Sequence, residues 1–199
     1  MRVAIIIPAR LHSTRLPGKL LLPAAGLPLI CHTLLAAENL RCLAPEIFTP
    51  PIVATDAPEI AQVVRDFSRE RHLSSQAVLT RSNHLSGSDR IAEAAEALPP
   101  EIDHVLNLQG DEPEIDPASL LPLLECLAKG KADLATLAYP LPASEATDPN
   151  LVKVVVDRAL RALYFSRANL PYRRSTNLNP PAYGHVGVYL YRRPALERF

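Results

Sequence analysis

The sequence predicts an α/β protein in which a mixed, mostly parallel sheet is flanked by helices and carries a small antiparallel arm. Residues 3–7 form an uninterrupted apolar run rich in β-branched side chains, which is typical of a strand covered on both faces. Strand-like and helix-like segments then alternate as far as Tyr139, an order that favours parallel strands joined by helical crossovers. Beyond Tyr139 the strand-like segments follow one another without long helices, which indicates antiparallel additions or a hairpin arm. A chain of 199 residues is expected to form one domain over residues 1–199.

Each element is predicted from its own residue pattern. Pro28 stands near the start of a helix-like segment in which Ile30, Leu34 and Leu35 can share one face. The basic segment 8–23, punctuated by proline and glycine, predicts a loop. The expected helices cover 28–40, 58–71, 88–98 and 117–127. The expected strands cover 3–7, 52–55, 77–79, 105–108, 133–139, 152–156, 162–165 and 187–191.

The composition is that of an ordinary globular protein, with 48% hydrophobic residues and a formal net charge of zero. There is no polybasic arm, and the aromatic residues are six tyrosines and four phenylalanines, so nucleic-acid binding is poorly supported. The three cysteines have no metal-ligand spacing and are expected to be idle thiols in a reducing compartment. No stretch is apolar and long enough to span a bilayer or to act as a secretory signal. We therefore expect a cytoplasmic protein with no membrane partner.

Polar clusters follow four of the predicted strands. They cover residues 8–19, 55–56, 80–90 and 109–112. In open α/β sheets a ligand binds at the carboxyl ends of the strands. The four clusters therefore predict one ligand site at that edge of the sheet.

The first cluster carries Arg10, Arg15 and Lys19 within ten residues, beside Gly18. Arginine offers bidentate hydrogen bonds to phosphate oxygens, lysine offers a compact charge, and glycine permits close approach of the backbone. The glycine spacing is not that of a P-loop. A solvated basic loop is the alternative, but its place directly after a buried first strand favours phosphate binding.

The cluster after the fourth strand offers Asp111 as a ligand for a hard cation. Magnesium takes one or two protein carboxylates and completes its shell with water and substrate phosphates. Glu112 could be exposed or could cap the following helix, whereas Asp116, just before Pro117, fits the helix-start role better than Asp111 does. Asp111 is therefore the expected magnesium ligand.

Two further clusters leave alternatives open. Hydroxyls and amides beside Gly87 suit recognition of a base or ribose edge, although Ser88 fits a helix N-cap equally well. His84 has no visible carboxylate partner and is expected to be a loop residue. Arg167 could bind a substrate carboxylate, and His185 is a candidate either for the site or for a structural role.

Several of these motifs together resemble one enzyme family. Ile7-Pro8-Ala9-Arg10 with Ser13-Thr14-Arg15-Leu16-Pro17-Gly18-Lys19, and Gln109-Gly110-Asp111-Glu112-Pro113, resemble signatures of the 3-deoxy-manno-octulosonate (Kdo) cytidylyltransferases. The resemblance also covers residues 53–56, 80–90, 150–156, 164–167, 171 and 185–187. It implies a nucleotide-diphospho-sugar transferase (Rossmann-like) fold.

The resemblance also implies the reaction and the roles of the residues. CTP and Kdo would give CMP-Kdo and pyrophosphate for lipopolysaccharide biosynthesis, with Mg²⁺ as cofactor and a homodimer as the assembly. The implied roles are CTP binding by Arg10, Arg15, Lys19, Arg81, Ser86 and Gln109, sugar binding by Gln109, Arg167 and His185, metal binding by Asp111, and catalysis by Lys19, Arg10 and Asp111.

The chain departs from the family pattern in three ways. Ser88 stands where threonine is common, and Leu190 where glycine is usual. The family also continues past Phe199 with a helical segment that contacts Kdo and a second metal-binding aspartate. Two alternative functions therefore remain: a cytidylyltransferase for another acidic sugar, and a CTP-binding module without turnover.

Overall fold

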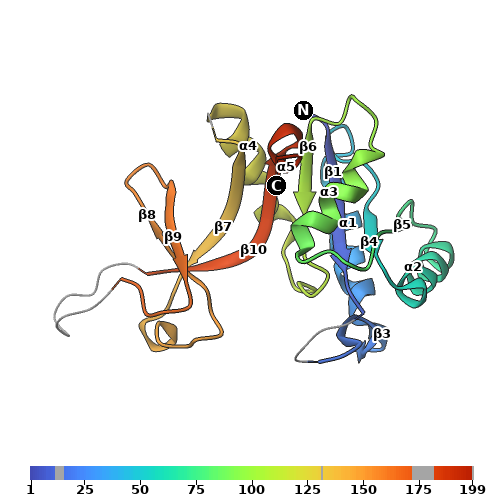
Figure 1. Cartoon of the computed structure of the whole chain (residues 1–199), viewed down its shortest axis with the longest axis horizontal. Coiled ribbons are helices and arrows are strands. Elements are labelled where there is room, and N and C mark those ends of the chain that lie inside the picture. The colour runs from blue at the N-terminus through green and yellow to red at the C-terminus, as the bar shows by residue number, and fades with distance from the viewer. Residues whose placement is uncertain (12–15, 131, 172–181, 199) are drawn as a thin grey trace. The chain divides into compact units, whose positions relative to one another are not determined.

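The computed structural model describes residues 1–11, 16–130, 132–171 and 182–198. The chain divides into two compact units, Met1–Ala135 with Val188–Phe199 and Thr136–Gly187. Strands β7 (Leu134–Pro140) and β10 (Tyr183–Arg192) contribute residues to both units (Figure 1). The expectation of a single domain stays a prediction.

The first unit contains the parallel part of the sheet, in the order β5-β4-β1-β6, with β10 antiparallel at its β6 side. Its strands are β1 (Val3–Ala9), β4 (Ile52–Thr55), β5 (Gln76–Leu79) and β6 (His104–Asn107). Its helices are α1 (Leu29–Leu43), α2 (Pro58–Glu70), α3 (Gly87–Glu96), α4 (Leu121–Lys129) and α5 (Arg193–Leu196). All seven residues of β1 are buried, as a strand covered on both faces requires.

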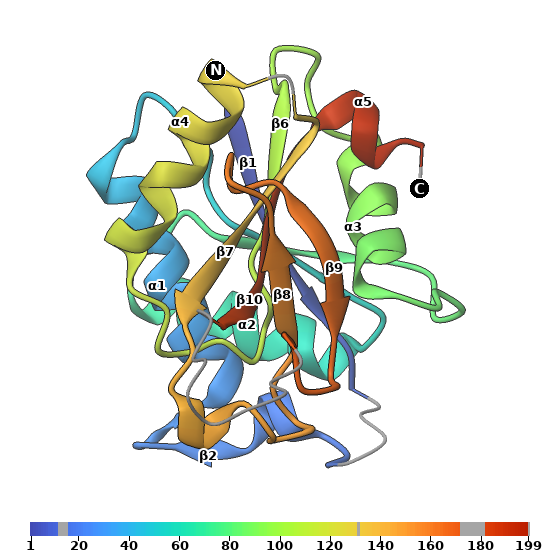
Figure 2. The ribbon, with the colours of Figure 1, turned by 90° about the vertical axis from the view of Figure 1, so that its left-hand side faces the viewer.

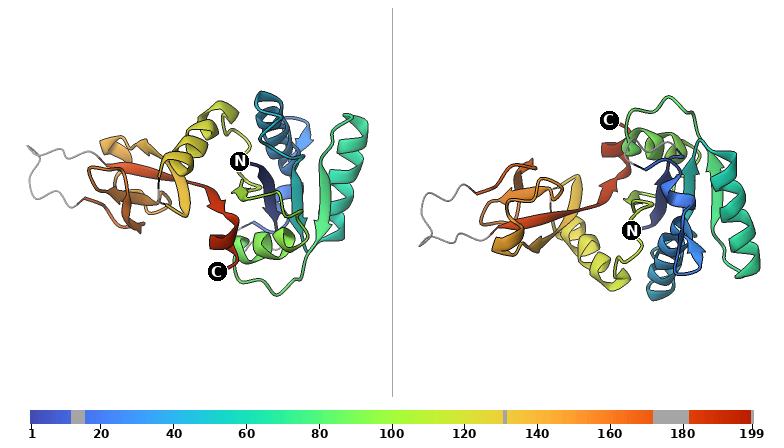
Figure 3. Two further views of the ribbon diagram at one scale, coloured as in Figure 1. Left: turned by 90° about the horizontal axis from the view of Figure 1, so that it is seen from above. Right: turned by 90° about the horizontal axis from the view of Figure 1, so that it is seen from below.

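Helices cover both faces of this sheet because the chain reverses direction across it. From β1 it steps outward through α1 and α2 to β4 and β5, and α3 then leads back past β1 to β6. Right-handed crossovers place the helices of the two directions on opposite faces, and Figures 2 and 3 show α1 and α3 on opposite sides of the strands. On the α3 face, Ala4 and Ile6 of β1 pack in one buried cluster with Ile91 and Leu196.

The second unit is antiparallel. Strand β8 (Lys153–Val156) pairs with β9 (Ala162–Ser166), and the first residues of β10 pair with β8. Leu141, Ala146 and Ala182 form its buried apolar cluster. Gly184 lies against the ring of Tyr139, where a Cβ atom would overlap the ring. The expected antiparallel arm is confirmed.

Most differences from the expected elements lie at turns. The predicted loop over 8–23 contains the short turn η1 (Lys19–Leu21) and strand β2 (Pro23–Ala24), which pairs with β3 (Leu27–Pro28). Ala25 and Gly26 both have positive φ, as the tightest hairpin turns require.

Two other expected elements differ in extent. The helix expected over 117–127 is divided into η2 (Pro117–Leu120) and α4, and each of these segments has a proline at its first or second position. Strand β10 starts at Tyr183, earlier than expected, since its first residues pair with β8. The short turn η3 (Ala143–Glu145) and α5 were not expected. Among the described residues, no helix combines the length and apolar character that crossing a membrane requires.

Candidate active site

The candidate site lies where the chain changes direction across the parallel sheet, at the carboxyl ends of β1 and β6. These neighbouring strands run parallel, with Ile6 opposite Asn107. The segments that follow them carry Arg10 after β1 and Gln109 to Asp111 after β6. Ligands of doubly wound sheets bind at such switch points, so the expected convergence of the first and fourth clusters is confirmed.

The structure brings Lys19 and Asp111 together although 92 positions separate them. The Lys19 Nζ atom donates a hydrogen bond to Asp111 Oδ2 at 2.9 Å. Gly18, at φ 68°, allows the left-handed turn that begins η1, and the neighbouring Leu20 is buried. The ion pair is 39% and 48% exposed at its two side chains. Both charged groups therefore remain accessible to a ligand.

Gly110 fixes the segment after β6 against β1. A Cβ atom there would lie 3.1 Å from Pro8 O and 3.3 Å from the Ile30 and Leu20 Cδ1 atoms. The Thr33 hydroxyl donates a buried hydrogen bond of 2.9 Å to Gly110 O. The backbone that presents Asp111 is thus held from both sides.

The acidic residues of this segment suit a cation shared with a substrate. Burial raises the pKa of the Glu112 carboxyl, the Asp111 charge raises it further, and Lys19 opposes the shift. Among the described residues no group of three or more His, Cys, Asp or Glu side chains could hold a metal ion. One or two carboxylates that leave positions for phosphate oxygens and water are the usual magnesium arrangement, so Asp111 fits that ion.

Ser86 is the N-cap of helix α3 and directly precedes its first residue, Gly87. The Ser86 Oγ atom accepts from the Asp89 backbone N–H at 3.1 Å, and the Ser86 N–H donates to the Asp89 carboxylate at 2.8 Å. This reciprocal pair is a capping box, and hydrogen bonds from Ser86 hold the pKa of Asp89 below its usual value. The alternative that Ser88 is the N-cap is wrong; Ser88 Oγ lies 3.4 Å from Tyr191 Oη.

The expectation that His84 has no carboxylate partner is also wrong. Its Nε2 atom contacts the Glu93 carboxylate, which also accepts from the Arg81 backbone N–H at 3.0 Å. The hydrogen bond with His84 is the largest of the effects that lower the pKa of Glu93. The partner was missed because α3 turns Glu93 back toward the loop that precedes the helix.

Arg10 joins the first cluster to this loop. Its Nη2 atom donates to Leu85 O at 3.2 Å. Gln109 donates to Asn107 Oδ1 at 3.0 Å and lies 3.9 Å from the position of a Cβ atom on Gly87. Arg10, Ser86 and Gln109 therefore surround the start of α3, and Arg81 lies at the other end of the same loop. Arg15 lies outside the described residues.

Arg90 was not assigned a role from the sequence, although it joins two of the polar clusters. The side chain is 1% exposed, its Nη2 atom lies 3.2 Å from Asp56 Oδ2, and its Nη1 atom donates to the Thr80 hydroxyl. It thereby links α3 to the ends of β4 and β5. The sequence offered one signal for this contact: Asp56 stands at a strand end and has no cation near it in the sequence.

Arg167 and His185 belong to the second unit, where each has protein partners. Arg167 Nη1 donates to Asn150 O at 2.7 Å and to Pro149 O at 3.1 Å. His185 Nε2 lies 3.0 Å from Thr136 Oγ1, its ring stacks edge-on against Phe165, and burial lowers its pKa. Their sugar-binding roles stay predictions.

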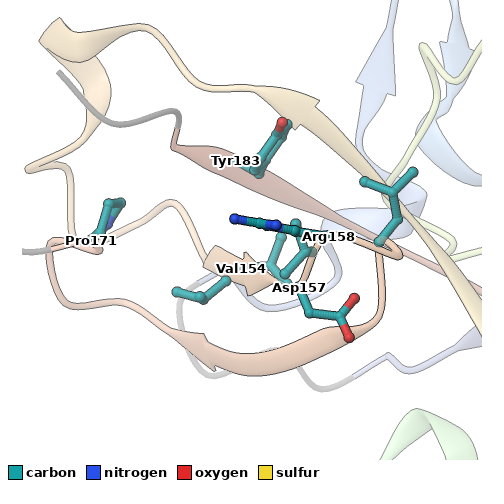
Figure 4. Close-up of a pocket in the computed structure, with 8 residues that line it drawn as sticks. Val154, Asp157, Arg158, Pro171 and Tyr183 are labelled. Carbon is teal, nitrogen blue, oxygen red and sulfur yellow. The ribbon is translucent and has the colours of Figure 1, made fainter.

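The second unit also contains a cavity of about 320 Å³, lined by Val154, Asp157, Arg158, Pro171 and Tyr183 among others (Figure 4). None of the residues predicted to bind CTP, sugar or metal lines it.

The sheet topology defines a class of protein, the α/β proteins with a doubly wound, mostly parallel sheet. Within that class the chain belongs to the cytidylyltransferase family, whose model matches residues 4–199. The predicted fold and family are confirmed.

Individual relatives share a more specific name than the family does. The chain is 44% identical to 3-deoxy-manno-octulosonate cytidylyltransferase of Chlorobium phaeobacteroides strain BS1, over all of this chain and 77% of the relative. It is 48% identical to the enzyme of the same name from Rhodopseudomonas palustris strain BisB5, over 98% and 76% of the two chains.

Solved structures agree. The structure of CMP:2-keto-3-deoxy-manno-octonic acid synthetase complexed with CTP matches with a TM-score of 0.85 and 39% identity, covering 100% of this chain and 77% of that one. The 4-diphosphocytidyl-2C-methyl-D-erythritol synthase of Anaerococcus prevotii matches with a TM-score of 0.63 over 99% of this chain and 74% of that one. At 13% identity the second match shows the fold alone.

Proposed function

We propose that this chain transfers CMP from CTP to Kdo, forming CMP-Kdo and pyrophosphate for lipopolysaccharide biosynthesis. The observation that carries the proposal is the accessible Lys19–Asp111 pair at the switch point between β1 and β6, in a chain 39% identical to a CMP-Kdo synthetase that was solved with CTP. The cytoplasmic location and the homodimer implied by the family belong to the same proposal.

The residues of the first unit provide the positioning that this reaction needs. Arg10 and Lys19 bind the triphosphate, with Arg15 expected beside them, and Asp111 holds Mg²⁺, which neutralises phosphate charge when bound. Ser86 and Arg81 lie by the cytosine, and Gln109 lies between nucleotide and sugar. Arg167 and His185 approach the acidic sugar.

The chemistry requires no side-chain nucleophile. A hydroxyl oxygen of the sugar forms a bond to the α-phosphorus, the bond from that phosphorus to the bridging oxygen breaks, and pyrophosphate leaves with the electron pair. The hydroxyl proton is released to solvent. Catalysis on this scheme comes from positioning and from stabilisation of charge.

The decisive measurement is pyrophosphate release from CTP with Kdo and Mg²⁺. We expect release that depends on Kdo and falls roughly a hundredfold or more in Asp111→Ala, because the metal carboxylate is lost. Glu114→Ala is the matched control, since Glu114 is an exposed acidic residue of the same segment; it should retain activity.

The outcomes separate the alternatives. Faster turnover of sialic acid than of Kdo would contradict the substrate. CTP binding in a calorimeter without any pyrophosphate release would support a binding module instead.

A further inference from the structure

The Glu93 carboxylate on α3 contacts two residues of the loop that precedes the helix. The Glu93 oxygens accept from the Arg81 backbone N–H at 3.0 and 3.3 Å, and Arg81 Nε lies 3.5 Å away. His84 Nε2 contacts the same carboxylate, and only 9% of the His84 side chain is exposed. Glu93 thus fixes one half of the segment 81–86, which we call the α3 loop.

A second carboxylate on α3 fixes the other half. Asp89, four residues before Glu93, accepts from the backbone N–H and the hydroxyl of Ser86, each at 2.8 Å. Leu85 lies between the residues held by the two acids, and its side chain is 92% exposed. Apolar burial of Leu85 therefore does not hold the loop, and its conformation depends on the two carboxylates.

The carbonyl of this exposed residue meets the candidate site. Leu85 O accepts the hydrogen bond from Arg10 Nη2 at 3.2 Å. An arginine side chain has many rotamers, and a bond to a fixed acceptor selects among them. A displacement of the α3 loop would release Arg10 from the direction in which the structure holds it.

We propose that Glu93 is a positioning residue that acts through the α3 loop to orient Arg10 for the nucleotide. The inference rests on the proposed function for the identity of the ligand, CTP. Glu93 has no described contact with Arg10 or with the Lys19–Asp111 pair, so its effect on Arg10 is indirect. The Arg81 side chain is 66% exposed, so its ion pair with Glu93 stabilises the fold only weakly.

The test is a double-variant cycle on CTP affinity, measured by calorimetry on the full chain. Glu93→Ala should weaken CTP binding about tenfold, and Arg10→Ala should then cause about tenfold less additional loss than it does in the unaltered chain. Glu96→Ala is the matched control, because Glu96 is an exposed glutamate three residues further along α3. It should bind CTP normally, and adding Arg10→Ala to it should weaken CTP binding as much as Arg10→Ala does in the unaltered chain.

The conservative variant and kinetics supply a second readout. Glu93→Gln keeps one carbonyl acceptor and should recover part of the lost affinity. In turnover, Glu93→Ala should raise the KM for CTP more than it lowers kcat. If the effects of Glu93→Ala and Arg10→Ala multiply, or if Glu93→Ala binds CTP as Glu96→Ala does, the proposal is overturned.

Limited proteolysis tests the loop without any ligand. Trypsin should cleave after Arg81 faster in Glu93→Ala than in Glu96→Ala. Equal rates would overturn the claim that Glu93 fixes the α3 loop. Failure of the proposed function looks different: the coupling between Glu93 and Arg10 persists in CTP binding while Kdo gives no pyrophosphate. Absence of CTP binding by the unaltered chain would overturn both.

Discussion

Among the described residues, each of the two compact units buries one arginine or lysine side chain, and the two side chains are stabilised in different ways. Arg90 in the first unit is 1% exposed and faces the Asp56 carboxylate at 3.2 Å. Lys153 in the second unit is 0% exposed and donates to three backbone carbonyls, those of Asp148, Leu151 and Arg167, at 2.7 to 2.9 Å. One charge is neutralised by an opposite charge, whereas the other is surrounded by dipoles.

The difference shows what each cation does locally. All three Lys153 bonds end on main chain, so this residue fixes the path of the 148–151 turn and of the backbone at Arg167. Arg90 bonds to side chains and joins α3 to two strand ends; among the described residues its Nε atom has no hydrogen-bond partner. Lys153 is therefore stabilised by hydrogen bonds to carbonyl groups, whereas Arg90 is stabilised mainly by the opposite charge of Asp56.

The largest effect is expected from removal of one member of the buried ion pair. Arg90→Met leaves the Asp56 carboxylate largely buried without its cation, which should lower the free energy of unfolding by about 3–5 kcal/mol. Urea denaturation measures this loss. Asp56→Asn combined with Arg90→Met removes both charges and should restore much of the stability. An equal loss in the double variant would show that packing, rather than charge, is what Arg90 supplies.

A smaller effect is expected from Lys153→Met. The substitution leaves three carbonyls without their donor, but no charge is left uncompensated, so the loss should be about 1–3 kcal/mol. Hydrogen exchange of amides in residues 136–171 measures it in the unit concerned. Lys129→Met, which removes an exposed lysine paired with Glu125, is the control and should leave exchange almost unchanged. A loss larger than that in Arg90→Met would reverse the comparison.

Features formed by consecutive residues could be predicted from the sequence better than contacts between distant residues. The parallel strands and the cluster after β1 were predictable because burial of β1 and the cations that follow it are consecutive in the chain. Contacts such as Lys19 with Asp111 could be expected only as convergence at a sheet edge. Their pairing depends on the turn at Gly18 and on the close packing of Gly110, which no periodicity encodes.

Partners brought together by a helix were missed for a related reason. Glu93 is nine positions from His84, and Arg90 is ten from Thr80. Both contacts depend on where the helix starts relative to the preceding loop, and the sequence left Ser88 open as an N-cap although the N-cap is Ser86. In the second unit, Lys153 could not be identified as a buried cation because its partners are carbonyls, which every residue carries.

The smallest expected effect concerns protonation of His185 in the second unit. Burial lowers the pKa of His185 below 6.5, and its described neighbours, Thr136 and Phe165, are uncharged. The unfolded chain therefore binds a proton at a higher pH than the folded chain does. The stabilisation is present above pH 6.5 and is lost as the pH falls through the lowered pKa.

His185→Gln cannot titrate, so the difference in unfolding free energy between it and the unaltered chain should shrink in that pH range. The control for loss of a histidine is His72→Asn, at an exposed position whose positive φ suits asparagine. If the difference in unfolding free energy between the two proteins stays constant with pH, the second unit tolerates a charged His185, as it tolerates the buried charge of Lys153.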